Sequence, residues 1–376
     1  MESLTKRERV LRTAHFQETD RVPLYDILQN DAIIEHYATD LLHGEPLTTA
    51  NGRRATGFAI GRVLDMTRMP GGPAEPGEIR QENGICIQKE RWTSWITCRP
   101  FTDEPGMVEW VKGEIQRAHA LKFGASQRDT FYSWLEESNA FSAAGDPTGR
   151  VDPAVQVIES GVGLTEIYWM LGWDNFTILM FDYPDLLEEW LEARLQAELR
   201  RVAAIADPQH IPIALTYDDI AYKSGLLLSP RWLRRYWVPR LRQLVNAWHN
   251  RDVLCLFHSD GNLWAILDDL VTVGIDGLNP LEVLAGMSVK AVREKYPRLF
   301  LTGGIDVSQL LPFGTPDEVR AVCRQAIADT NRHGYFLGST TELHWDVQLE
   351  NAIAMFETAC ERENRGSPGY LPISIL

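Results

Sequence analysis

From residue 150 onward, short apolar runs alternate with longer stretches whose apolar positions recur at helical spacing. Each run is predicted to be a buried strand, and the stretch after it is predicted to be helical. The strands are Val155–Ile158, Ile213–Thr216, Val253–Phe257, Ile275–Leu278, Leu299–Thr302 and Tyr335–Leu337, and the helices are 163–172 with 184–206, 229–250, 262–273, 287–295, 315–331 and 348–362. Such repetition is typical of a parallel sheet covered by helices.

The N-terminal part shows a less regular pattern. Residues 3–16 are amphipathic, Val22–Tyr25 is a short strand-like run, and 30–64 has helical spacing. Residues 78–99 alternate polar and apolar positions, which predicts a hairpin that also supplies one barrel strand. With these two strands the chain has about eight βα units. We therefore expect an α/β fold, a (β/α)8 TIM barrel with N-terminal helical and hairpin additions over about 1–150, in a single domain spanning 1–376.

Composition narrows the class of protein further. The chain has 376 residues, of which 44% are apolar, so it can bury a large core. A net charge of −15 argues against a nucleic-acid or membrane surface, and small molecules and proteins are the expected partners. No apolar run reaches the length of a membrane span. The five cysteines are widely spaced without a CxxC pair, which predicts no disulfide framework and fits the cytoplasm.

Polar residues follow the predicted strands at the end where a parallel barrel binds its ligands. The clearest case is Phe257–Asn262, which places a histidine and a carboxylate directly after an apolar strand. A set of such residues at successive strand ends resembles the rim of an active site. Its members are Glu159, Asp218, Asp219, His258, Asp260, Glu282, Asp306, Glu342 and His344.

Two pairs in this set have the spacing of metal ligands. His258 and Asp260 are two residues apart, so in an extended segment both side chains point the same way, and Glu342 and His344 repeat that spacing. Together they could supply three or four nitrogen and oxygen ligands to zinc and leave one position open for substrate.

Several residues at the strand ends could have either a functional or a structural role. Asp218 and Asp219 could act in catalysis or cap the next helix. Gly303 and Gly304, which precede Asp306, allow close backbone approach to a ligand but are also ordinary turn residues. We assign Gly303, Gly304, Asp306 and Glu282 to substrate binding, and Asp219, Glu159 and Asp218 to catalysis.

Several short motifs along nearly the whole chain resemble those of the uroporphyrinogen decarboxylase superfamily. They are specific as a set rather than singly. The motifs are Thr5–Val10 with Asp20–Pro23, Gly172–Phe176, Asp218–Asp219, Ser229–Pro230, His258–Asn262, Gly303–Asp306 and Asp346–Asn351. The resemblance implies a (β/α)8 barrel, in agreement with the strand count, and is compatible with a homodimer.

The superfamily contains porphyrinogen decarboxylases and methyltransferases that work with corrinoid proteins. The decarboxylases carry an arginine-rich stretch that binds the acidic side chains of the tetrapyrrole. The corresponding segment here, Leu24–Asn30, contains no arginine, so an octa-anionic substrate would find no cationic partner in it. The chain is therefore more similar to the methyltransferase branch.

The methyltransferase branch commonly holds zinc through a His-x-Cys pair and a later cysteine. Here His258 matches the histidine, Asp260 replaces the first cysteine, and Thr341 stands near the second. Without thiolates, zinc would be a harder ion, better suited to polarising an ether oxygen than to carrying a thiolate. This departure argues against thiol methylation and favours the half-reaction that removes a methyl group from a donor.

The first hypothesis is a methyltransferase of the O-demethylase type. It would move a methyl group from a small methoxylated or methylated compound to cobalamin carried by a separate corrinoid protein, because the chain has no Asp-x-His-x-x-Gly motif of its own. Two alternatives stay open. One is a metal-free decarboxylase of a non-porphyrin acid, with Arg21 or Arg62 on the carboxylate, and the other is a non-catalytic binding subunit.

Overall fold

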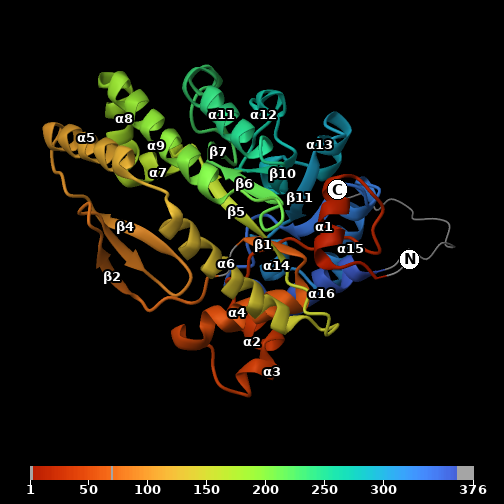
Figure 1. Ribbon diagram of the computed structural model, residues 1–376. Helices are drawn as coiled ribbons and strands as arrows, with labels where there is room; N and C mark the ends of the chain where they lie inside the picture. The colour runs from red at the N-terminus through yellow and green to blue at the C-terminus, as the bar shows by residue number, and fades with distance from the viewer. Residues whose placement is uncertain (1–2, 69–70, 362–376) are drawn as a thin grey trace.

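A curled parallel sheet forms the centre of the molecule (Figure 1). The computed structural model describes residues 3–68 and 71–361. The strands follow one another in the order β1 (Met66–Arg68), β5 (Val155–Gly161), β6 (Ile213–Tyr217), β9 (Leu254–His258), β10 (Gly277–Leu281), β11 (Phe300–Ile305) and β12 (Tyr335–Ser339). The six runs predicted after residue 150 are all present as neighbouring strands.

The segment around Leu24 joins the two edges of this sheet. The amide of Tyr25 donates to the carbonyl of Leu337 in β12 at 3.0 Å, and the amide of Met66 in β1 donates to the carbonyl of Leu24 at 3.1 Å. Parallel bridges pair Leu24 with Leu337 and Tyr25 with Met66. The predicted first strand therefore lies between β12 and β1, in the place of the eighth strand of a TIM-barrel-like ring. The predicted fold class is confirmed.

Helices surround the sheet and also extend the N-terminal half. Figure 1 shows α9 and α11 along one side of the barrel and α2 to α4 together at another. The bounds are α1 Lys6–Ala14, α2 Asp31–Tyr37, α3 Thr39–Leu42, α4 Thr49–Val63, α5 Glu104–Ala120, α6 Ala125–Gly145, α7 Leu164–Leu171, α8 Trp173–Asp182, α9 Pro184–Ile205, α10 Pro230–Trp232, a π-helical turn Leu233–Trp237, α11 Val238–His249, α12 Leu267–Val273, a 3-10 turn Val283–Ala285, α13 Val289–Lys295, α14 Leu310–Phe313, α15 Pro316–Asp329 and α16 Leu349–Cys360. Residue 362, the last of the predicted C-terminal helix, lies outside the described residues.

The hairpin prediction was wrong in one respect. Residues 78–99 form a separate antiparallel sheet of β2 (Gly77–Arg80), β3 (Cys86–Lys89) and β4 (Ser94–Cys98), which stands to one side of the barrel beside α5 (Figure 1). The barrel strand is instead β1, directly after α4. A strand of three residues is too short for its alternation to be recognised in sequence.

The expectation of no disulfide was also wrong. Cys86 and Cys98 face each other in the register of β3 and β4 and are joined by a disulfide. Twelve residues separate them in sequence, and only the antiparallel pairing brings their Cα atoms to 4.9 Å. Among the described residues, no helix combines the length and apolar content that a membrane crossing requires.

Apolar side chains fill the part of the barrel nearer the amino ends of its strands. Successive side chains in a strand point to opposite faces, so every second residue of each strand enters the barrel. A cluster of buried residues fills this space, and Val10 and Ala14 of α1 pack against it. Its strand members include Tyr25, Met66, Val157, Leu215, Leu256, Phe300 and Phe336. The next inward position of each strand lies one layer closer to the carboxyl end.

Candidate functional site

Polar side chains occupy that next inward layer. Two residues after buried members of the apolar cluster in β1, β5, β6 and β9 come Arg68, Glu159, Tyr217 and His258. Strand alternation therefore turns all four toward the carboxyl end of the barrel interior. Of these, only Glu159 and His258 were predicted from sequence, because Arg68 lies in the unrecognised strand β1 and Tyr217 precedes the Asp218–Asp219 pair.

His258 is held in one orientation by a chain of hydrogen bonds. Its Nδ1 lies 2.6 Å from Oδ1 of Asn279 in the neighbouring strand, and Nδ2 of Asn279 donates to Oγ1 of Thr302 at 2.5 Å. Because the amide nitrogen of Asn279 is used by Thr302, its oxygen faces the imidazole and accepts from Nδ1–H. Nε2 of His258 is therefore the unprotonated nitrogen, the arrangement found in metal-binding histidines.

The imidazole of His258 is neutral. Burial and then the nearby guanidinium of Arg68 lower its pKa to about 3, although the hydrogen bond to Asn279 acts in the opposite direction. One guanidinium nitrogen of Arg68 lies within hydrogen-bond distance of both ring nitrogens, at 3.1 Å each, and Nε2 is the one that can accept from it. His258 is thus a Lewis base across the pH range in which proteins are usually folded.

Two carboxylates converge on the side of His258 that carries the lone pair. Oδ1 of Asp219 lies 3.7 Å from Nε2 of His258 and accepts the amide N–H of Asp260 at 3.3 Å. One ligand atom from each of His258, Asp219 and Asp260 lies within 4.8 Å of the others. We call these three residues the His258 cluster.

Asp260 supplies the oxygen of the His258 cluster that most needs a partner. Oδ1 of Asp260 is buried and has no hydrogen-bond partner among the described residues. Burial, together with Asp219, Glu282 and Glu342, raises the pKa of Asp260 to about 8. A buried oxygen of this kind is stabilised by a proton or a cation. One imidazole nitrogen and two carboxylates fit zinc or a similar divalent ion with positions left for substrate.

The second predicted pair of ligands lies outside the cluster. Glu342 is near enough to raise the pKa of Asp260 but is not among the three groups that converge. Nδ1 of His344 accepts the amide N–H of Asp346 at 3.2 Å, and its ring centroid lies 5.6 Å from that of Trp345. Asp219, which we predicted as a catalytic residue, is the third group that converges with His258 and Asp260, and metal binding by Glu342 and His344 stays a prediction.

Several other predicted site residues make contacts within the fold. Asp218 is fully buried and accepts the amide of Thr165 and Nε1 of Trp237, each at 2.8 Å, and burial raises its pKa to about 7. Oε2 of Glu282 accepts the amide N–H of Gly261 at 2.7 Å. These contacts support the loops around the His258 cluster. The roles assigned to Asp218 and Glu282 in catalysis and substrate binding stay predictions.

The Gly303–Asp306 motif likewise has contacts to the fold. Asp306 accepts the amides of Gln309 and Leu310 at 2.7 and 2.8 Å, as a residue capping a turn does. Gly303 and Gly304 both have positive φ, and a Cβ on Gly304 would lie 2.5 Å from Cγ2 of Val289. Packing against α13 is thus one reason for glycine at 304, and substrate binding by the motif stays a prediction.

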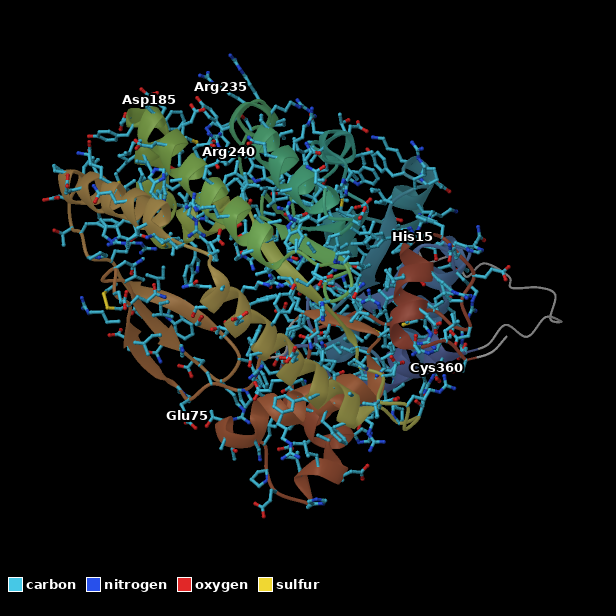
Figure 2. The ribbon with its side chains drawn as sticks, viewed as in Figure 1. His15, Glu75, Asp185, Arg235, Arg240 and Cys360 are labelled. Carbon is cyan, nitrogen blue, oxygen red and sulfur yellow. A yellow bond between two sulfur atoms is a disulfide. The ribbon has the colours of Figure 1, made fainter. Side chains whose placement is uncertain are left out.

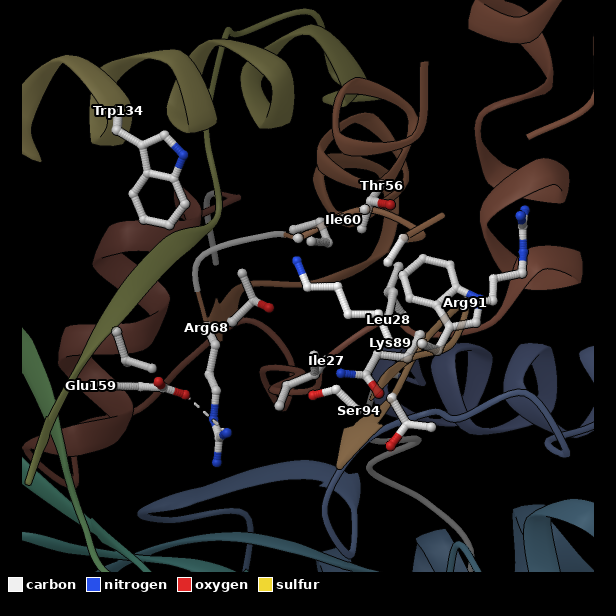
Figure 3. Close-up of a pocket in the computed structure, with 18 of the residues that line it drawn as sticks. Ile27, Leu28, Thr56, Ile60, Arg68, Lys89, Arg91, Ser94, Trp134 and Glu159 are labelled. Atoms are coloured by element: carbon white, nitrogen blue, oxygen red, sulfur yellow. Dashed lines mark ion pairs between the residues drawn. The ribbon is translucent and has the colours of Figure 1, made fainter. Parts of the chain in front are cut away.

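Arg68 connects the His258 cluster with a cavity of about 610 Å³ (Figure 3). One nitrogen of its guanidinium lies 3.1 Å from Nε2 of His258, and another pairs with Oε1 of Glu159 at 3.0 Å. We call this space the hairpin cavity because β3 and the β3–β4 turn form one wall. Its other walls come from the Leu24–Asn30 segment, α4, α6 and β5. A ligand in the hairpin cavity would contact Arg68 and Glu159 directly.

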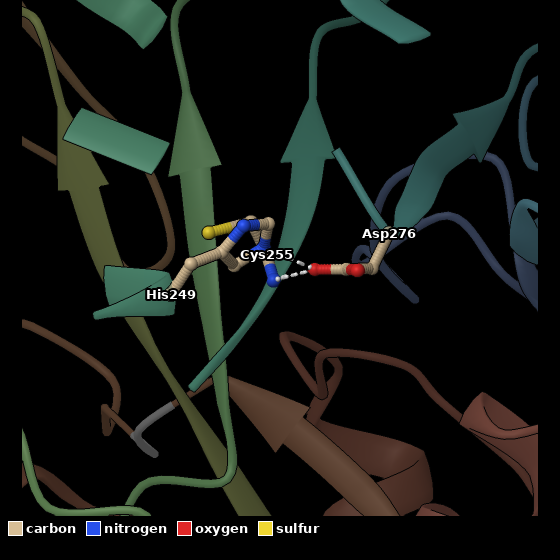
Figure 4. Close-up of side chains that lie close together, drawn as sticks. All are labelled: His249, Cys255 and Asp276. Carbon is tan, nitrogen blue, oxygen red and sulfur yellow. Dashed lines mark hydrogen bonds and ion pairs between the residues drawn. The ribbon is translucent and has the colours of Figure 1, made fainter. Parts of the chain in front are cut away.

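A second group of possible metal ligands lies elsewhere in the barrel wall (Figure 4). His249, Cys255 and Asp276 approach one another, and Oδ2 of Asp276 accepts both Nε2 of His249 and the amide of Cys255 at 2.7 Å. Burial raises the pKa of the Cys255 thiol well above its ordinary value, so the thiolate is disfavoured. The bonds of Asp276 join the end of α11 to β9, which is a structural role.

The pair of His249 and Asp276 predicts a pH-dependent stability. The hydrogen bond to Asp276 raises the pKa of His249, against the opposing effect of burial. The stabilisation is therefore complete below the ordinary histidine pKa of about 6.5 and is lost as pH rises through the raised value. His249→Gln should lower the free energy of unfolding more at about pH 5 than at about pH 9. Urea unfolding at both values measures this, and an equal loss at both would refute it.

The fold and the polar layer define the class: a TIM-barrel-like protein with a candidate ligand site at the carboxyl ends of its strands. The chain belongs to the uroporphyrinogen decarboxylase (URO-D) family, whose model matches residues 163–362, more than half of the chain. The matched region includes the whole His258 cluster, whereas Arg68 and the hairpin precede it.

One solved structure shares this fold over nearly its whole length. A methyltransferase from Methanosarcina mazei is 18% identical with a TM-score of 0.65, and the likeness covers 95% of this chain and 98% of that one. A xylose isomerase-like TIM barrel protein from Mycobacterium smegmatis is 12% identical with a TM-score of 0.34, covering 69% and 90%.

A curated relative matches a shorter region. The alanine–tRNA ligase of Pyrobaculum aerophilum is 29% identical over 171 residues, which cover 40% of this chain and 19% of the ligase. The match thus spans about a fifth of the ligase's length.

Proposed function

We propose that this protein is a metal-assisted methyltransferase of the O-demethylase type. It would take a methyl group from a small methoxylated or methylated compound and deliver it to the cobalt of a separate corrinoid protein. Two observations on one residue carry the proposal: Asp260 converges with His258 and Asp219, and its buried Oδ1 has no hydrogen-bond partner among the described residues. The likeness in fold to a methyltransferase supports it.

The metal would be held by His258, Asp219 and Asp260. His258 is preset for this role because Asn279 and Thr302 fix its ring and tautomer. When bound, zinc polarises an ether oxygen and so makes the attached methyl group a better target for a nucleophile. Oxygen-rich ligands leave the ion more electrophilic than thiolates would.

Arg68 and Glu159 are the residues that would position the methyl donor. The carboxylate of Glu159 is half exposed toward the hairpin cavity, and its ion pair holds Arg68 between the cavity and His258. A donor in the cavity would thus have its oxygen beside the guanidinium, which can donate hydrogen bonds to it. Because Asp219 lies with the metal ligands, we assign the orienting role to Glu159.

Porphyrinogen decarboxylation has no support from the Leu24–Asn30 segment. Ile27, Leu28 and Gln29, from the segment that carries arginines in the decarboxylases, face the hairpin cavity here. For a decarboxylase of another acid, Arg21 pairs with Asp65 at 2.7 Å and Arg62 pairs with Asp40. Both arginines line a different cavity, with Lys6 and Arg9. Neither is therefore placed to hold a carboxylate beside the His258 cluster.

Methyl transfer can be measured directly. Zinc-loaded protein is mixed with a methoxylated compound and reduced cobalamin, and the absorbance change that marks methylcobalamin is followed. We expect methylcobalamin to form with the wild type and not with His258→Ala. Release of carbon dioxide from a carboxylic acid without cobalamin would favour the decarboxylase. Binding of the donor without either product would favour the non-catalytic subunit.

A further inference from the structure

The hairpin cavity has the size and walls of a site for a small aromatic molecule. Its volume of about 610 Å³ lies within the usual range for ligand pockets. Trp92, Phe131 and Trp134 contribute aromatic rings to its lining, and Ile27, Leu28 and Ile60 contribute aliphatic side chains. Flat aromatic and branched aliphatic walls favour a planar apolar ligand body.

The cations that line the cavity differ in whether they are paired. Arg68 is paired with Glu159 at 3.0 Å, Arg91 with Asp31 at 2.7 Å, and Arg201 with Glu198 at 2.7 Å. Lys89 has no carboxylate within ion-pair distance among the described residues. The neighbouring Glu90 instead accepts a hydrogen bond from Gln88.

Lys89 reaches into this space from the last position of β3. Figure 3 shows its side chain extending into the cavity toward Ile60. It is half-buried, so an anion beside it would be partly shielded from water. The attraction between opposite charges is stronger in such a place than at an open surface.

We infer that Lys89 is the anion-binding residue of a substrate subsite, and that the ligand of the hairpin cavity is an aromatic carboxylate. The carboxylate binds the ammonium group of Lys89, and the ring lies among Trp92, Phe131 and Trp134. This inference rests on the proposed function in one respect: the opposite end of the ring carries the methoxy group toward Arg68.

Direct binding tests the inference without any methyl transfer. Three probes are titrated into metal-free protein, and dissociation constants are measured by calorimetry. They are 4-methoxybenzoate, its neutral amide 4-methoxybenzamide, and methoxyacetate, which keeps the charge and lacks the ring. We expect the benzoate to bind most tightly, because it alone meets both the lysine and the aromatic walls.

Substitutions identify the role of the charge. Lys89→Met keeps the aliphatic stem, and we expect it to weaken benzoate binding roughly tenfold to a hundredfold while leaving the amide unchanged. Lys89→Arg should restore most of the benzoate affinity. Lys290→Met, which removes an exposed lysine on α13, should change neither. Equal effects of Lys89→Met on benzoate and amide would overturn the inference.

The two proposals fail in different ways. If the benzoate binds through Lys89 but no methylcobalamin forms, the subsite stands and the proposed function is wrong. If a neutral methoxyarene donates its methyl group while the benzoate binds no better than the amide, the proposed function stands and the subsite is wrong.

Discussion

Asp260→Asn is expected to lower the rate of methyl transfer by roughly a thousandfold or more, because a metal ion typically contributes several kcal/mol of transition-state stabilisation. The substitution replaces a carboxylate that could ionise and bind the metal by a neutral amide of nearly the same volume. The chain should still fold, since the buried oxygen that becomes an amide has no hydrogen-bond partner to lose. The loss should therefore appear in kcat with no loss of folded protein.

The comparison variant for this prediction is Asp185→Asn, which removes one negative charge from the exposed first turn of α9 (Figure 2). It should retain the wild-type rate. Both variants are assayed for methylcobalamin formation, with circular dichroism to verify that they are folded. If Asp260→Asn kept a rate within about twofold of the Asp185→Asn rate, the carboxylate would have no part in metal-assisted transfer.

Asp65→Ala is expected to lower the free energy of unfolding by about 3–5 kcal/mol, the usual result of removing one partner from a buried ion pair. Asp65 is fully buried directly before β1 and lies 2.7 Å from both Arg9 and Arg21. It also accepts the amide of Leu24 at 2.9 Å. Although burial opposes ionisation, Arg21 and Arg9 hold the pKa of Asp65 below its ordinary value.

A surface ion pair serves as the control for the buried pair of Asp65. Asp40 pairs with Arg62 at the surface, where its side chain is 72% exposed, and Asp40→Ala should cost less than about 1 kcal/mol. Chemical denaturation of the wild type, Asp65→Ala and Asp40→Ala measures the loss of unfolding free energy in each variant. Similar losses for Asp65→Ala and Asp40→Ala would show that Asp65 does not fasten α1 and the first strand segment to the barrel.

The barrel could be predicted from sequence because its later strands are buried on both faces. Runs such as Val253–Phe257 are therefore continuously apolar and are separated by helices of ordinary length. The first part of the barrel gave no such pattern. Met66–Arg68 has three residues, and its partner segment around Leu24 forms only isolated bridges. The longer alternating stretch 78–99 has the pattern of a barrel strand, and the prediction of one there was wrong for that reason.

The sequence predicts those residues of the candidate site that directly follow a recognisable strand. His258 and Asp260 follow a recognisable strand, so strand-end placement found them. The third member depended on which loops meet in space: Asp219 approaches from β6, whereas His344 contacts Asp346 and Trp345. Asn279 could have been found by noting that it shares the register of His258 in the next strand. Lys89 had no sequence signal, because it reaches the cavity through the separate hairpin sheet.

The metal content of the purified protein tests the central claim most directly. The wild type, Asp260→Asn and Asp185→Asn are purified without chelator or nickel resin, saturated with zinc, dialysed and measured by plasma mass spectrometry. We predict close to one zinc per chain in the wild type and in Asp185→Asn, and almost none in Asp260→Asn. A wild type that retains no metal, or an Asp260→Asn variant that retains as much as the wild type, would contradict the proposed metal centre.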